Sequence, residues 1–131
     1  MTKKRIILIE DDDVIVFLTT KLIKESENVE LLNVLKNGQK AIDYFLENAV
    51  NEELLPDVIF LDLSMPILDG WQFIEAYKIV ENILPKKIEI YITTSSISPQ
   101  DIRKAKECGV LISDFIIKPI SKQSFNDIFV G

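Results

Sequence analysis

The side chains able to do chemistry stand directly after short apolar runs of the chain. Four consecutive acids occupy positions 10–13 after one run, and Asp62 follows another. Hydroxyl side chains at 93–96 follow a third run, and Lys118 follows a fourth. Carboxylates, hydroxyls and a lysine are the groups that together bind a divalent cation and a phosphoryl group.

The acidic cluster indicates a cation site. Adjacent carboxylates repel one another unless solvent or a cation relieves the repulsion. Asp12 and Asp13 fit the N-terminus of a helix, where acidic residues are favoured. Glu10 and Asp11 come before that helix, and their hard oxygen atoms suit Mg²⁺. Asp62 supplies a third carboxylate, which can act as a metal ligand and as a nucleophile that forms an aspartyl phosphate.

The hydroxyls and the lysine are weaker signals taken singly. A hydroxyl at 93–96 can donate to a phosphoryl oxygen, and Lys118 can supply a cation to the same crevice. Each is an ordinary loop residue alone, but the combination after four different strands is specific. The Lys118–Pro119 bond is open to either isomer. Asp69 and Gly70 are interpreted as turn residues.

Alternating strands and helices are predicted to position these residues. Apolar runs rich in β-branched residues predict strands at 6–9, 29–34, 58–61, 88–93 and 111–117. Segments of helical period predict helices at 13–26, 38–49, 70–83, 99–108 and 121–130. This alternation indicates an α/β protein with a parallel sheet covered by helices on both faces. The carboxyl ends of such strands form the ligand-binding edge.

Local signals support the predicted helix ends. Ser98 and Ser121 can cap the last two helices, and Pro99 suits the first position of its helix. Gly109, after Cys108, suits a C-terminal cap.

Composition limits the classes of protein that remain. The chain has 131 residues, 47% hydrophobic and 27% charged, which suits one globular domain. It has no histidine, which excludes Ser-His-Asp catalysis, zinc sites built on histidine and phosphohistidine chemistry of its own. A net charge of −6 disfavours a nucleic-acid partner. A single cysteine and the absence of a membrane span or signal peptide favour a cytoplasmic protein.

With these residues in place, the chain resembles the receiver domain of response regulators in two-component signalling, of the single-domain type similar to chemotaxis regulators. The resemblance covers essentially the whole chain, so that 1–131 is expected to be one receiver domain with no output domain. It implies a flavodoxin-like (βα)5 fold, a three-layer sandwich whose parallel five-stranded sheet has the order 2-1-3-4-5.

The resemblance also implies the metal site. Asp62, within 60–66, matches the phosphoacceptor, and Glu10 and Asp11 match the acidic pair that binds Mg²⁺ or Mn²⁺. Asp11 is then the direct ligand, and Ser64 falls where the family gives a backbone carbonyl to the metal. The pair is Glu-Asp here rather than Asp-Asp, which lengthens one side chain.

The remaining residues match a phosphoryl-transfer apparatus and a switch. The donor would be a histidine kinase or a histidine phosphotransfer protein, with Lys118 neutralising the transferring oxygens. Thr94, in preference to Thr93, matches the hydroxyl that moves toward the phosphoryl group, and Phe115 matches the aromatic that turns into the vacated space. The surface formed by the elements at 99–130 would then change for a downstream protein target. Such a regulator, a monomer or weak dimer, catalyses only its own phosphorylation and dephosphorylation.

Residues 14–18 are not explained by the site. Five successive apolar positions cannot all lie on one helix stripe facing a sheet. Either neighbouring elements cover a wide stripe, or an apolar edge is exposed beside the acids, where a kinase or phosphotransfer helix docks.

Two alternatives to a phosphorylated receiver stay open. A haloacid-dehalogenase-type phosphatase would use Asp11 as its nucleophile, but it would leave Asp62 unexplained and needs a longer chain. A pseudo-receiver would keep the fold and signal by binding alone. A flavin-binding flavodoxin is disfavoured because the acids at 10–13 would repel a phosphate, and a Rossmann site because the chain contains no Gly-x-Gly.

Overall fold

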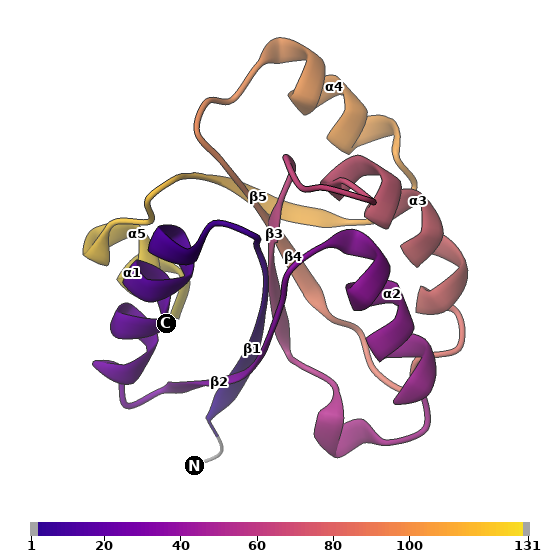
Figure 1. The fold of residues 1–131 in the computed structure, drawn as a ribbon, viewed down its shortest axis with the longest axis horizontal. Helices are drawn as coiled ribbons and strands as arrows, with labels where there is room; N and C mark the ends of the chain where they lie inside the picture. The colour runs from indigo at the N-terminus through magenta and orange to yellow at the C-terminus, as the bar shows by residue number, and fades with distance from the viewer. Residues whose placement is uncertain (1–2, 130–131) are drawn as a thin grey trace.

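Five parallel strands form the centre of the molecule (Figure 1). The computed structural model describes residues 3–129, and the strand order of its sheet is β2-β1-β3-β4-β5. The strands are β1 (Lys4–Ile9), β2 (Val29–Leu35), β3 (Val58–Asp62), β4 (Glu89–Thr94) and β5 (Ile112–Ile117). Every residue of the central strand β3 is buried, as its unbroken apolar run predicts. The predicted fold and strand order are confirmed.

Helices connect the strands and form the two outer layers. They are α1 (Asp13–Lys24), α2 (Gly38–Glu47), α3 (Gly70–Glu81), α4 (Pro99–Glu107) and α5 (Lys122–Phe129), with a short 3-10 helix η1 (Glu52–Leu54) before β3. α1 and α5 cover one face of the sheet, and α2 and α3 cover the other (Figure 1). The predicted boundaries agree to within two residues, although η1 was not predicted and position 130 lies outside the described residues. Among residues 3–129, no helix has the length and apolar character needed to cross a membrane.

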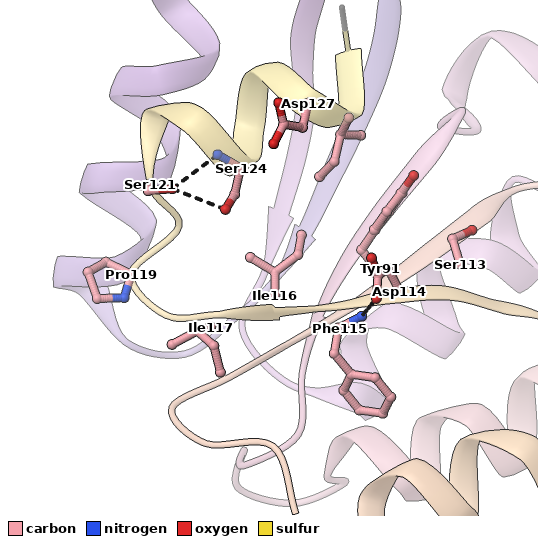
Figure 2. A pocket seen from close by; sticks show the side chains of 11 residues that line it. Tyr91, Ser113, Asp114, Phe115, Ile116, Ile117, Pro119, Ser121, Ser124 and Asp127 are labelled. Atoms are coloured by element: carbon pink, nitrogen blue, oxygen red, sulfur yellow. Dashed lines mark hydrogen bonds between the residues drawn. The ribbon is translucent and has the colours of Figure 1, made fainter. Parts of the chain in front are cut away.

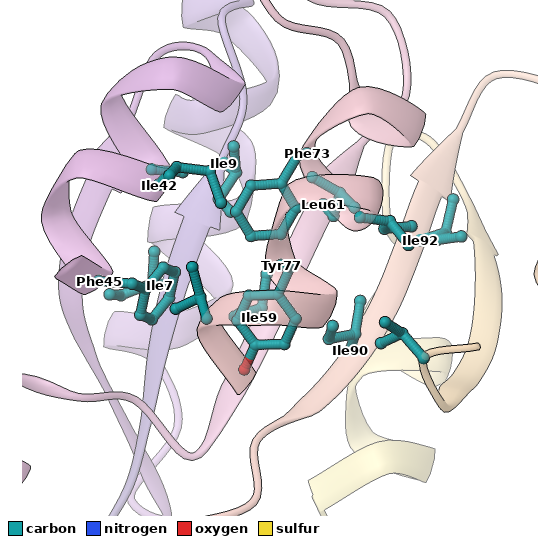
Figure 3. Packing of buried hydrophobic residues seen from close by; sticks show 14 of the residues in the cluster. Ile7, Ile9, Ile42, Phe45, Ile59, Leu61, Phe73, Tyr77, Ile90 and Ile92 are labelled. Atoms are coloured by element: carbon teal, nitrogen blue, oxygen red, sulfur yellow. The ribbon is translucent and has the colours of Figure 1, made fainter. Parts of the chain in front are cut away.

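Each face of the sheet has its own hydrophobic core. Because side chains alternate along a strand, Ile7 of β1 faces α2 and α3, whereas Leu8 faces α1 and α5. Figure 3 shows the first core, where the rings of Phe45, Phe73 and Tyr77 pack among isoleucines of the strands. Burying each such side chain contributes roughly 1.5–3 kcal/mol. The two cores therefore fix the strand ends that carry the polar residues.

The acids after β1 have separate local roles. Asp12 is the N-cap of α1, and its carboxylate accepts hydrogen bonds from the backbone N–H groups of Val14 and Ile15. Asp13 is the first residue of the helix and forms an ion pair with Lys36. Capping therefore accounts for Asp12, and the helix dipole favours Asp13. Glu10 and Asp11, which come before the helix, are left for another role.

The predicted helix ends in the second half of the chain are confirmed. Ser98 caps α4 by accepting a hydrogen bond from the N–H of Asp101 at 3.0 Å. Ser121 accepts one from the N–H of Ser124 at 3.0 Å at the start of α5. Gly109, just after α4, has a φ of +81°, a conformation that glycine adopts without strain.

Candidate functional site

Asp62 ends β3 at the centre of the sheet, between β1 and β4. It is paired with Thr93 of β4 and is only 2% exposed. Its Oδ1 accepts a hydrogen bond from the N–H of Ser64 at 3.2 Å and another from the ammonium group of Lys118 at 2.9 Å. A buried carboxylate at a strand end is thus held in one orientation by a backbone donor and a cation.

Lys118 directly follows the edge strand β5, and its side chain brings a positive charge to this carboxylate. Its Nζ also lies 3.3 Å from Oε1 of Glu10, and its backbone N–H donates to the carbonyl of Thr94 at 2.8 Å. The peptide bond to Pro119 is cis, which sequence left open. Burial alone lowers the pKa of Lys118, but the hydrogen bond to Asp62 and the two nearby negative charges hold it above its usual value. The ammonium group is therefore charged at neutral pH.

Glu10 and Asp11 complete a cluster of three carboxylates with Asp62. One oxygen from each residue lies within 4.8 Å of the others, although Glu10 is buried and Asp11 is exposed. Burial first, and then the neighbouring Asp62, raise the pKa of Glu10 to about 7, while Lys118 opposes the shift. A divalent cation would offset both causes. The hard oxygen donors and their crowding therefore fit Mg²⁺ or Mn²⁺.

The two adjacent threonines of β4 face opposite sides of the sheet. Thr93 lines a small cavity with Glu10 and Phe60 on the α1 and α5 side. Thr94, the last residue of β4, lies on the other side by strand alternation. Its hydroxyl donates to the carbonyl of Ser96 at 2.9 Å and so is held by its own loop.

Phe115 shares the face of Thr94. It pairs with Ile92 of β4 and is half-buried against the core beneath α3. Figure 2 shows Phe115 and Ile117 on the opposite side of β5 from Ile116. Phe115 is among the residues that line a pocket between β5 and α5 (Figure 2), whose volume is about 610 Å³. The predicted switch residues thus lie on one side of two neighbouring strands.

Two residues of the loop after Asp62 do more than make a turn. Asp69 caps α3 and forms a capping box with Gln72, with both hydrogen bonds at 2.9 Å. A Cβ atom on Gly70 would lie 2.6 Å from the carbonyl oxygen of Asp62. Only glycine lets α3 begin against the end of β3. The Asp-x-x-Gln spacing signals the capping box in the sequence, but the close approach of Gly70 is a property of the fold.

Comparison with known proteins agrees with this geometry. Residues 6–129 match the family model of the response regulator receiver domain. The chain belongs to this family, whose members are the receiver modules of two-component signalling.

Individual relatives show how much of longer proteins the chain covers. It is 29% identical over 120 residues to a protein-glutamate methylesterase/protein-glutamine glutaminase of Clostridium acetobutylicum, which is 91% of this chain and 32% of that protein. It is 28% identical over 116 residues to the probable methanogenesis regulatory protein FilR2 of Methanothrix harundinacea, 88% of this chain and 72% of that one. The chain thus spans about a third of the methylesterase and matches only its receiver part.

A solved structure of a response regulator has the same fold over nearly the whole chain. A two-component response regulator from Cytophaga hutchinsonii superposes with a TM-score of 0.83 at 27% identity, covering 98% of this chain and 96% of that chain.

Proposed function

We propose that this receiver domain is a phosphoacceptor in a two-component phosphorelay and that Asp62 is the residue phosphorylated. One observation carries the proposal: Lys118 Nζ bridges the buried carboxylates of Asp62 and Glu10, with Asp11 beside them. This is the charge arrangement that in-line transfer of a phosphoryl group to a carboxylate requires.

The transfer itself is a substitution at phosphorus. An oxygen of Asp62 bonds to the phosphorus of a phosphohistidine while the P–N bond breaks, and its electron pair stays on the imidazole. The 131 residues contain no histidine, so the phosphohistidine lies outside them, on a histidine kinase or a histidine phosphotransfer protein. Mg²⁺, held by Glu10, Asp11, Asp62 and the Ser64 carbonyl, would supply positive charge to the phosphoryl oxygens. The ammonium group of Lys118, already at Asp62, supplies the second positive charge.

The geometry favours this function over a phosphatase with Asp11 as nucleophile. Lys118 contacts Asp62 and Glu10, whereas Asp11 is exposed and carries no such contact among the described residues. A nucleophile that must receive a phosphoryl group needs the cation beside it.

Intact mass after incubation with acetyl phosphate and Mg²⁺ tests the proposal. We expect one phosphoryl adduct that is absent in Asp62→Asn, present in Asp11→Asn at a reduced rate, and present in Asp69→Asn. Asp69→Asn is the matched control because asparagine still caps α3. An adduct that persists in Asp62→Asn refutes the assignment. No adduct and no beryllofluoride binding by the folded wild type indicates a pseudo-receiver.

The start of α1 supports a docking surface for the phosphodonor. Val14 and Phe17 are 65% and 67% exposed, so the apolar run at 14–18 is only partly covered. This exposed edge begins directly after the four acids at 10–13, which suits a helix that presents a phosphohistidine. Phe17→Ser is expected to slow transfer from the cognate donor but not from acetyl phosphate. Equal slowing of both reactions would contradict the docking role.

Thr94 and Phe115 are proposed to pass phosphorylation to the surface of α4, β5 and α5. Phosphorylation would draw the Thr94 hydroxyl from Ser96 toward the phosphoryl group, and Phe115 would turn toward the space it leaves. Thr94→Ala should accept a phosphoryl group normally but lose phosphorylation-dependent binding of the downstream target. Unchanged target binding would remove Thr94 from the switch.

A further inference from the structure

α4 is the helix least anchored in the cores. None of its residues is buried, whereas every other α-helix within residues 3–129 buries at least one side chain. Ile102, its largest apolar residue, is 42% exposed. Helices in proteins are held mainly by packing an apolar face. Contacts other than core burial must therefore hold α4 in position.

Trp71, in the first turn of α3, provides such contacts. Its indole N–H donates to Oδ1 of Asp101 at 3.4 Å, and Nζ of Lys104 lies 5.7 Å from the centroid of its ring. Asp101 and Lys104 are three residues apart, so they lie on one side of α4. Trp71 also packs against the core beneath α3. We call these three residues the Trp71 clasp. Its bonds, a long hydrogen bond and a cation–π contact, are weak enough to open.

The clasp is connected to Asp62 through the backbone. Trp71 follows Gly70, where even a Cβ would meet the carbonyl oxygen of Asp62 at 2.6 Å. The N–H of Gly70 donates to the carbonyl of Leu63 at 3.0 Å. With backbone in contact with backbone, a displacement at the end of β3 must displace the first turn of α3, because close-packed atoms transmit strain.

We propose that Trp71 is a positioning residue that clasps α4 to α3 and couples the position of α4 to the phosphoacceptor strand. The coupling rests on the proposed function, because its input is the phosphoryl group on Asp62, whereas the clasp itself exists without phosphorylation. When the first turn of α3 shifts, the contacts to Asp101 and Lys104 lengthen and α4 is released. This route runs along α3 and is separate from Thr94 and Phe115.

Hydrogen exchange of the α4 backbone in the unphosphorylated protein tests the clasp. Lys104→Met removes the cation but keeps the aliphatic chain, and Lys106→Met is the matched control on the same helix. We expect α4 amides to exchange about two- to fivefold faster in Lys104→Met and at the wild-type rate in Lys106→Met. The α4 amides should exchange faster in Trp71→Leu than in Lys104→Met, because Trp71→Leu removes both contacts. Equal rates in Lys104→Met and Lys106→Met would overturn the clasp.

Beryllofluoride with Mg²⁺ then tests the coupling. Trp71 is the single tryptophan of the chain, so its fluorescence reports the clasp directly. We expect bound beryllofluoride to change this emission and to speed the hydrogen exchange of the α4 amides in the wild type. The increase in exchange rate should be smaller in Lys104→Met, where the clasp is already weakened. Bound beryllofluoride without any change at α4 would refute the coupling. Failure of beryllofluoride to bind at all would refute the phosphoacceptor function and leave the exchange result for the clasp standing.

Discussion

Gly70→Ala is expected to destabilise the protein and to slow phosphorylation of Asp62. The added Cβ would lie 2.6 Å from the carbonyl oxygen of Asp62 and 2.8 Å from Cα of Leu63, where ordinary contact begins at 3.4 Å. Both neighbours are backbone atoms and cannot rotate away. α3 must therefore move from β3 by several tenths of an ångström, or the phosphoacceptor strand must shift.

The size of the effect follows from two opposing contributions. Overpacking of this kind costs about 1–3 kcal/mol, while alanine in place of glycine in a helix gains up to about 1 kcal/mol. We expect a net loss of roughly 1–2 kcal/mol in urea unfolding and a fall in Tm of roughly 5 °C. The rate of adduct formation with acetyl phosphate should fall about tenfold, because the attacking carboxylate is displaced.

Gly38→Ala is the matched control. Its Cβ would meet the carbonyl oxygen of Leu68 at the same 2.6 Å, and its three nearest atoms all belong to Leu68 and none to Asp62. We expect a similar loss of stability with phosphorylation close to the wild-type rate. Wild-type or greater stability of Gly70→Ala, or equal slowing of phosphorylation in the two variants, would refute the reasoning.

Three further predictions concern the charges and the backbone around the site. Lys118→Met leaves Glu10 and Asp62 buried together without their cation. The metal-free protein at pH 8 should therefore lose about 3–5 kcal/mol in urea unfolding; stability equal to the wild type would contradict the role of Lys118. Because the folded protein binds the Glu10 proton more tightly than the unfolded chain, this group's contribution to stability is lost as pH rises from 4.5 to about 7. In EDTA, the free energy of unfolding of Glu10→Gln should therefore rise by on the order of 2 kcal/mol relative to that of the wild type over that interval. A difference in unfolding free energy that does not depend on pH would exclude the raised pKa. Ile67 has a φ of 69° in a turn closed by the N–H of Leu68 on the carbonyl of Pro66. Ile67→Asn should raise stability by about 1 kcal/mol, whereas Ile67→Val should not; unchanged stability in both variants would argue against strain at this position.

The sequence predicted the elements because their patterns are local. The apolar run of β3 marks a strand buried on both faces, and Ser98 before Pro99 marks the start of α4. Helix ends differ by one or two residues because periodicity does not define the last turn of a helix.

The sequence also predicted that the polar residues would meet. Alternating strands and helices make the sheet parallel, and parallel strands bring their carboxyl ends to one edge. Glu10 and Lys118 follow β1 and β5, and Asp62 ends β3. In the structure Lys118 contacts both carboxylates. The strand order and the separate role of each residue came from the family resemblance, because composition and spacing carry no information about either.

Tertiary structure alone decided which neighbours each side chain has. Thr93 and Thr94 are adjacent and chemically identical, yet strand alternation turns one toward Glu10 and the other toward Ser96. The apolar run at 14–18 is compatible with a wide covered stripe or with an exposed edge. The packing of α1 leaves Val14 and Phe17 exposed.

The contacts between distant segments lie furthest from the sequence. Gly70 is interpreted as a turn residue and Trp71 is not singled out in the sequence. No local pattern names the backbone of Asp62 or the side chains of α4 as their neighbours. Local propensity and periodicity depend on residues a few positions apart, and these are readable in the chain. Contact across thirty residues depends on how the cores orient whole elements, and only the folded protein decides it.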